Sequence, residues 1–104
     1  LSMGGMAALD MMLRWPDLFA AIEPICSAVN IRRLEQYEGH TAVRLFHGEC
    51  DSTVPVHFSR EAYDVLKKKE LDVEYIEYPE TWHNSWDKAF AERDFLSWML
   101  SREK

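Results

Sequence analysis

Short strand-like segments alternate with longer segments of helical periodicity along the whole chain, and this alternation limits the folds available to it. Short apolar or alternating runs predict strands over 19–26, 42–47 and 73–78. Apolar residues at helical spacing predict helices over 3–14, 30–38, 57–70 and 86–101. Such an order implies parallel strands joined by right-handed crossovers. We therefore predict the α/β class, with any ligand site at the carboxyl ends of the strands.

The last strand and the last helix carry expectations about burial. The segment 73–78 alternates strictly, which predicts one solvent-facing side near a sheet edge. The segment 86–101 is expected to be one continuous helix. Its buried side is expected to consist of Ala89, Phe90, Phe95, Leu96, Trp98 and Met99.

Charge and composition exclude several classes of partner. The net charge is −6 and the isoelectric point is about 5.1, which opposes binding to nucleic acid or to an anionic membrane, because both need a basic face. No apolar run approaches the ~18 residues that a membrane span requires. The spacing of Cys26 and Cys50 fits no zinc motif, and we expect neither a metal nor a cofactor. Two free thiols are favoured over a disulfide between these cysteines.

A serine followed by small residues stands directly before the first predicted helix, in the segment Leu1-Ser2-Met3-Gly4-Gly5. This is the right-hand part of G-x-S-x-G, in which the serine nucleophile lies on a strained strand-to-helix turn. Gly4 would keep bulk away from the turn, and Gly5 would let the helix pack closely on the sheet. The same motif makes the backbone N–H of Met3 one donor of an oxyanion hole. Alone, the motif is equally compatible with a serine that caps the helix.

A candidate acid follows the predicted strand 42–47. Gly48 ends that strand, so Asp51 falls on the loop at its carboxyl end. An aspartate there can accept the Nδ1 proton of a histidine and stabilise the imidazolium during turnover. The alternative is an aspartate that caps the turn or the next helix. Glu49 is the competing acid, and the position of Asp51 in the pattern favours Asp51.

A candidate base follows the predicted strand 73–78. His83 lies between this strand and the last helix, where a neutral imidazole could take the proton of Ser2 and return it to a leaving group. The other histidines have weaker claims: we expect His40 in an exposed turn, His47 as a structural residue and His57 as a cap or surface group.

The order serine, acid, histidine is that of α/β-hydrolases. Asp51 and His83 follow different predicted strands, and the motif around Ser2 implies a further strand before it. The sequence resembles the catalytic half of prolyl-oligopeptidase-like α/β-hydrolases over nearly its whole length. The resemblance is carried by Ser2-Met3-Gly4-Gly5, by His47-Gly48 with Asp51 and Val54-Pro55, by Tyr78-Pro79 with His83 and Trp86, and by the stretch 15–21. It implies that Ser2 is the nucleophile, Asp51 the acid and His83 the base.

That family contains carboxylesterases, feruloyl esterases among them, and serine peptidases. The short interval between Ser2 and Asp51 leaves no room for a large cap, which favours an esterase that works through an acyl-enzyme. A serine peptidase is the first alternative. A binding module built on an inactive hydrolase-like sheet is the second. The expected partner is a small ester or peptide substrate.

The start at Leu1 suggests a truncation, so we expect residues 1–104 to form part of a hydrolase domain whose N-terminal strands are absent. The second oxyanion donor would then lie in the missing half, and the fragment alone should be nearly inactive. Any targeting segment would lie upstream, which leaves the compartment open. Trp82 and Trp86 flank His83 and are candidates for the substrate pocket, with simple loop packing as the alternative.

Overall fold

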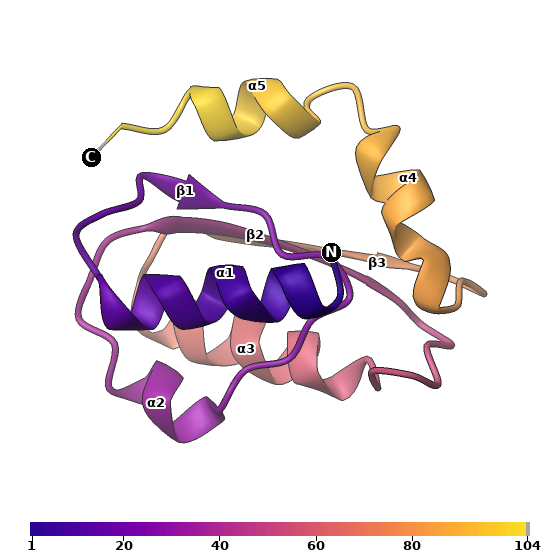
Figure 1. The fold of residues 1–104 in the computed structure, drawn as a ribbon, viewed down its shortest axis with the longest axis horizontal. Helices are drawn as coiled ribbons and strands as arrows, with labels where there is room; N and C mark the ends of the chain where they lie inside the picture. The colour runs from indigo at the N-terminus through magenta and orange to yellow at the C-terminus, as the bar shows by residue number, and fades with distance from the viewer. Residues whose placement is uncertain (104) are drawn as a thin grey trace.

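The computed structural model describes residues 1–103 and contains one sheet of three parallel strands, in the order β1-β2-β3. The strands alternate with helices, so the predicted α/β class is confirmed (Figure 1). The elements in chain order are α1 Met3–Arg14, β1 Ala21–Ile22, α2 Ile31–Glu35, β2 Ala42–Gly48, α3 His57–Lys68, β3 Val73–Tyr78, the short 3-10 helix η1 His83–Ser85, α4 Trp86–Phe90 and α5 Phe95–Leu100.

The central strand β2 is buried on both faces, which explains its nearly continuous apolar sequence. One face carries Val43 and Leu45, which belong to a core shared with α1, α2 and α3. The other face carries Phe46, which packs with Ile25, Ala89 and Phe95. In Figure 1, α1, α2 and α3 accordingly lie on one side of the sheet, whereas α4 and α5 lie on the other.

The predicted strand 19–26 is shorter in the structure, because Pro24 interrupts it. β1 itself covers only Ala21 and Ile22. Pro24 has no N–H to donate, although its carbonyl accepts the N–H of Phe46 at 3.0 Å. Beyond Pro24 the chain returns to β2 through a bridge between Ile25 and Phe46. The segment therefore follows β2 as far as Cys26, whose N–H donates to the carbonyl of Phe46 at 2.7 Å.

The prediction of one continuous helix over 86–101 is wrong. The helix ends at Phe90 and begins again at Phe95, and in Figure 1 α5 turns back across the sheet. The turn is tied to the sheet, because Tyr78 donates to Glu92 at 2.6 Å and Arg44 donates to Asp94 at 2.9 Å. These contacts would not form along a straight helix.

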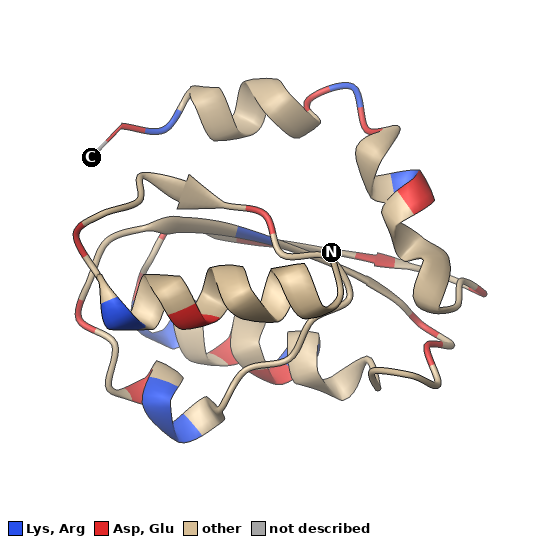
Figure 2. Cartoon of the chain, viewed as in Figure 1, with Lys and Arg blue, Asp and Glu red and all other residues tan. Residues whose placement is uncertain are grey.

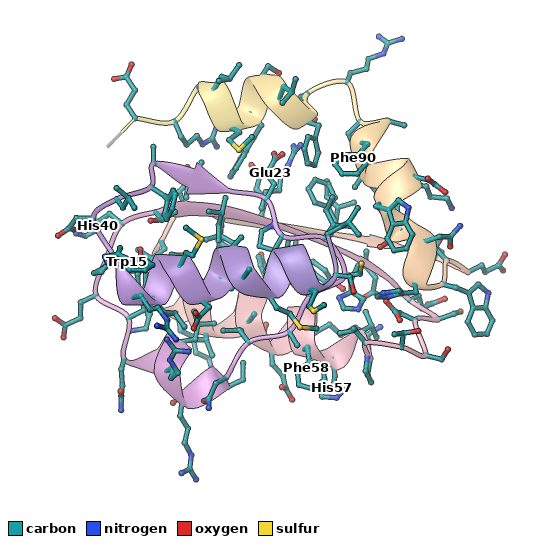
Figure 3. All side chains as sticks on the ribbon, viewed as in Figure 1. Trp15, Glu23, His40, His57, Phe58 and Phe90 are labelled. Atoms are coloured by element: carbon teal, nitrogen blue, oxygen red, sulfur yellow. The ribbon has the colours of Figure 1, made fainter. Side chains whose placement is uncertain are left out.

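The turn also changes which residues of this region are buried. Trp98 is buried and Ala89 fully so, as predicted, and Phe95 and Met99 are partly buried. Phe90 and Leu96, however, are 54% and 63% exposed, so their predicted burial is wrong. Figure 3 shows Phe90 on α4, beside the turn towards α5.

The predicted solvent-facing side of β3 is also wrong. Val73 and Tyr75 pack on the side of α3, and Ile76 and Tyr78 pack on the side of α4 and α5. Only Glu74 is exposed in this strand. α5, which the turn after α4 places over the sheet, supplies the second cover (Figure 1).

Charged residues are spread over the surface. Figure 2 shows Lys and Arg interspersed with Asp and Glu along α1 to α4, and in this view they do not form a single basic face. No helix within residues 1–103 has the length and apolar character needed to cross a bilayer.

Candidate active site

Ser2 occupies the sharp turn that leads into α1. Its backbone has φ 46° and ψ −115°, a conformation that costs a residue with a side chain on the order of 1–3 kcal/mol. The N–H of Ser2 donates to the carbonyl of Ile25 at 2.7 Å, which fixes the turn against the end of the β1 segment. The Ser2 side chain makes no capping hydrogen bond to α1. The alternative of a serine that caps the helix is therefore wrong.

The two glycines after Ser2 differ in their surroundings. A Cβ at Gly5 would lie 2.8 Å from the Cβ of Ser27 and 3.2 Å from the carbonyl of Ile25, so Gly5 permits the close packing predicted for it. At Gly4, apart from its own helix and its chain neighbours, no atom of the described chain lies within 4 Å of an added Cβ. Crowding therefore requires a small residue at position 5, as predicted, whereas no such crowding is found at position 4.

Asp51 lies on the loop after β2 with its side chain fully buried. Its Oδ1 accepts the N–H groups of Thr53 and Val54 at 2.9 and 2.8 Å. Burial raises the pKa of this carboxyl, but the hydrogen bonds from His83, Val54 and Thr53 outweigh burial and leave the pKa below its usual value. These contacts favour the ionised form of Asp51 and leave its other oxygen, Oδ2, facing the site.

His83 begins η1 and is positioned by the contact of its loop with the end of β2. The carbonyl of Thr81 accepts the N–H of Cys50 at 2.8 Å. A Cβ at Gly48 would lie only 2.4 Å from the carbonyl oxygens of both Thr81 and Trp82. Only a glycine at position 48 therefore lets the loop before His83 pass so close to β2.

The structure brings the three sequence-predicted residues together at the carboxyl end of the sheet. Ser2 Oγ lies 3.0 Å from His83 Nε2, and His83 Nδ1 lies 2.7 Å from Asp51 Oδ2. An ionised carboxylate can accept a hydrogen bond but cannot donate one, so the neutral His83 ring carries its proton on Nδ1, which faces Asp51. The lone pair of Nε2 is then available to the serine hydroxyl. The His83 side chain is 23% exposed, so this arrangement is open to a reactant from one side.

The competing residues do not reach this arrangement. Glu49 accepts the N–H of Glu80 at 3.1 Å and holds the neighbouring turn instead. His47 is fully buried and bonded to Ser59 and Val54, as expected of a structural residue. His40 and His57 are exposed, and Figure 3 shows them at the periphery, His40 beside Trp15 and His57 at the start of α3.

The aromatic candidates beside His83 differ in exposure. Trp86 is partly buried and meets the His83 ring edge-on, with 5.4 Å between the ring centroids. Trp82 is 57% exposed and is not part of either core cluster. Met3 is the first residue of α1, and the N–H groups in the first turn of a helix have no acceptor within that helix. This donor is available beside Ser2.

The cysteines are free thiols, as favoured over a disulfide; Cys26 is buried and Cys50 partly so. Burial raises the pKa of the Cys26 thiol. Donor atoms of Cys26, Asp51 and His83 lie within 4.8 Å of one another. Because both nitrogens of His83 and both oxygens of Asp51 are already hydrogen-bonded, a metal could bind there only by displacing those bonds.

The parallel sheet, the strained serine before a helix and the chain order serine, aspartate, histidine define an α/β-hydrolase. The family described as Phospholipase/Carboxylesterase matches residues 1–99, and the chain belongs to this family. No curated protein sequence gives a significant match.

Solved structures of esterases resemble the chain closely. A thermostable esterase superposes with a TM-score of 0.91 at 29% identity, over 100% of this chain and 30% of its own. Esterase PE8 gives a TM-score of 0.77 at 28% identity, over 95% of this chain and 47% of its own. The chain thus spans less than half the length of either esterase. Dipeptidyl peptidase 4 from Porphyromonas gingivalis has the same fold, with a TM-score of 0.79 at 12% identity over 98% of this chain and 19% of its own.

Proposed function

We propose that this chain carries the catalytic residues of a serine esterase that cleaves carboxylic esters through an acyl-enzyme. Ser2 is the nucleophile, His83 the general base and acid, and Asp51 the acid that orients His83. The observation that carries the proposal is the pair of contacts made by the His83 ring, 3.0 Å to Ser2 Oγ and 2.7 Å to Asp51 Oδ2.

In the first half of the reaction, Ser2 Oγ attacks the ester carbonyl carbon while its proton passes to His83 Nε2. Asp51 stabilises the resulting imidazolium through the Nδ1–H bond. The carbonyl oxygen becomes an oxyanion, for which the N–H of Met3 is one donor. When the intermediate collapses, His83 returns the proton to the alcohol that leaves. A water molecule then attacks the acyl-Ser2 ester by the same path and releases the carboxylic acid.

We further propose that residues 1–104 form the C-terminal part of a longer α/β-hydrolase domain. The coverage of only 30% and 47% of the two esterase structures supports this. So does β1, which pairs with β2 on one side and has no strand partner on its other side among residues 1–103. The remaining part would supply the second oxyanion donor and the strand that anchors Ser2. The isolated fragment should then be nearly inactive, because one missing donor costs about 10²- to 10³-fold in rate.

A serine peptidase with the same triad is the second candidate. The observation that supports it is the fold shared with dipeptidyl peptidase 4. The family match and the two esterases favour ester substrates. Trp86, which contacts the His83 ring, and Trp82, which is exposed beside it, are proposed to line the pocket of either enzyme. Parallel assays with p-nitrophenyl esters and aminoacyl anilides on the intact enzyme separate the two candidates.

The experiment that tests the triad is covalent labelling of the intact enzyme with a fluorophosphonate, which reacts only with an activated serine. We expect labelling of Ser2 that is lost in Ser2→Ala and in His83→Ala. Ser52→Ala, which changes an exposed serine next to Asp51, is the matched control and should label normally. A folded wild-type protein that neither labels nor hydrolyses esters would instead support an inactive binding module.

A further inference from the structure

A second histidine lies next to the aspartate of the site. His47 is the last residue of β2 before Gly48 and points to the same side of the strand as Val43 and Leu45, towards α3. Its side chain is fully buried, yet both ring nitrogens have polar partners. The mechanism above assigns no role to this ring.

The ring connects α3 to the loop that holds Asp51. His47 Nδ1 lies 2.6 Å from Ser59 Oγ on α3, and His47 Nε2 lies 2.7 Å from the carbonyl oxygen of Val54. Val54 in turn donates its N–H to Asp51 Oδ1 at 2.8 Å. Val54 is therefore held at its carbonyl by His47 while it holds the carboxylate of Asp51 with its amide.

The same nitrogen also faces the carboxylate directly. His47 Nε2 lies 3.4 Å from Asp51 Oδ2, the oxygen that accepts from His83. Both neighbours of His47 Nε2 are acceptors, so the proton of a neutral ring must lie on Nε2, and Nδ1 accepts from the Ser59 hydroxyl. This places an N–H dipole beside Asp51 Oδ2, the oxygen that also accepts from His83.

The environment of His47 favours the neutral form of its ring. Burial lowers the pKa of His47, although the Val54 carbonyl and the Asp51 carboxylate both favour the charged form. His83 opposes a charge on His47, and Glu77 on β3 favours one. An uncharged donor can orient the carboxylate without neutralising it, which leaves the full negative charge of Asp51 to act on His83.

We propose that His47 is a positioning residue of the active site, which holds the Val54 carbonyl and so fixes the Asp51 carboxylate in line with His83. The inference rests on the proposed function. It assigns a role in turnover to a histidine that the sequence marks only as structural.

The test compares two replacements at position 47 in the intact enzyme. His47→Gln keeps an amide N–H at the place of Nε2, whereas His47→Asn is too short to reach Val54 and keeps a polar group only near Ser59. We expect kcat of p-nitrophenyl ester hydrolysis to fall about 10- to 100-fold in His47→Asn, since a misplacement on the order of 1 Å can cost about 10²-fold, with KM nearly unchanged. His47→Gln should recover most of this loss. His57→Asn, at an exposed histidine, is the matched control and should keep the wild-type kcat.

Two results would overturn the inference: a folded His47→Asn with wild-type kcat, or equal losses in His47→Asn and His47→Gln, which would indicate packing alone. If His47→Asn does not fold, nitrogen NMR of the wild-type protein decides instead. The His47 ring should then remain neutral with its proton on Nε2 across the active pH range, and a proton on Nδ1 would contradict the proposal. Ester turnover that Ser2→Ala abolishes is a separate requirement, and its absence would refute the proposed function whatever the tautomer of His47.

Discussion

Replacing Gly48 by alanine should impair catalysis through the backbone that carries His83. The new Cβ would lie 2.4 Å from the carbonyl oxygens of Thr81 and Trp82, and contacts below 3.0 Å are essentially never tolerated. The loop must therefore move by at least 0.6 Å, the difference between these two distances. Because both carbonyls belong to backbone immediately before His83, the imidazole moves with them.

The size of the effect follows from that displacement. A shift approaching 1 Å at a catalytic group can cost about 10²-fold, so we expect kcat/KM to fall roughly 10- to 100-fold. The strain should also lower the free energy of unfolding by about 1–3 kcal/mol. Both quantities are measurable on the intact enzyme, the first by p-nitrophenyl ester hydrolysis per labelled active site and the second by urea unfolding.

Gly39 offers a matched control, because a Cβ there would also clash, but in the loop before the amino end of β2. It would lie 2.3 Å from Tyr37 Oη and 2.6 Å from the carbonyl oxygen of Pro16. Gly39→Ala should therefore lose stability while its kcat/KM per active site stays near wild type. A folded Gly48→Ala with unchanged kcat/KM, or an equal loss of activity in Gly39→Ala, would refute the reasoning.

Three further predictions concern the carboxylates and the aromatic ring beside the site. Asp51→Asn should lower kcat about 10⁴-fold, because an amide at this place favours the wrong tautomer of His83; fluorophosphonate labelling should slow in parallel, and normal labelling would contradict the assigned role. Burial raises the pKa of Glu23, which Figure 3 shows between the sheet and α5, to about 7 even beside Arg44. Between about pH 4.5 and 7 the native state then keeps a proton on Glu23 that the unfolded state has already lost. The free energy of unfolding should therefore fall by roughly 1–3 kcal/mol as the pH rises through this range. Urea titrations should show this pH dependence disappear in Glu23→Gln, and its persistence there would contradict the prediction. Trp86→Ala should raise KM for aromatic acyl esters more than for acetyl esters if its ring lines the pocket; equal changes for both substrates would assign it to loop packing.

Long-range pairing explains where predictions from the sequence were wrong. The break between α4 and α5 depends on Arg44 and Tyr78, which meet Asp94 and Glu92 from the sheet. Local periodicity over 86–101 holds no information about these partners, so it favours one helix. The same turn places α5 over the sheet, which is why neither face of β3 is fully exposed to solvent.

The sequence alone determined the order of elements and the edge at which the site would lie. Strand and helix periods are local properties, and in a parallel sheet every loop after a strand reaches the same edge, so residues 2, 51 and 83 could be expected to meet. Only the tertiary structure decided how they meet. The close passage of the chain over Gly48 and the burial of His47 next to Asp51 depend on contacts between segments distant in sequence, because close packing is set by the shapes of neighbours that local patterns do not specify.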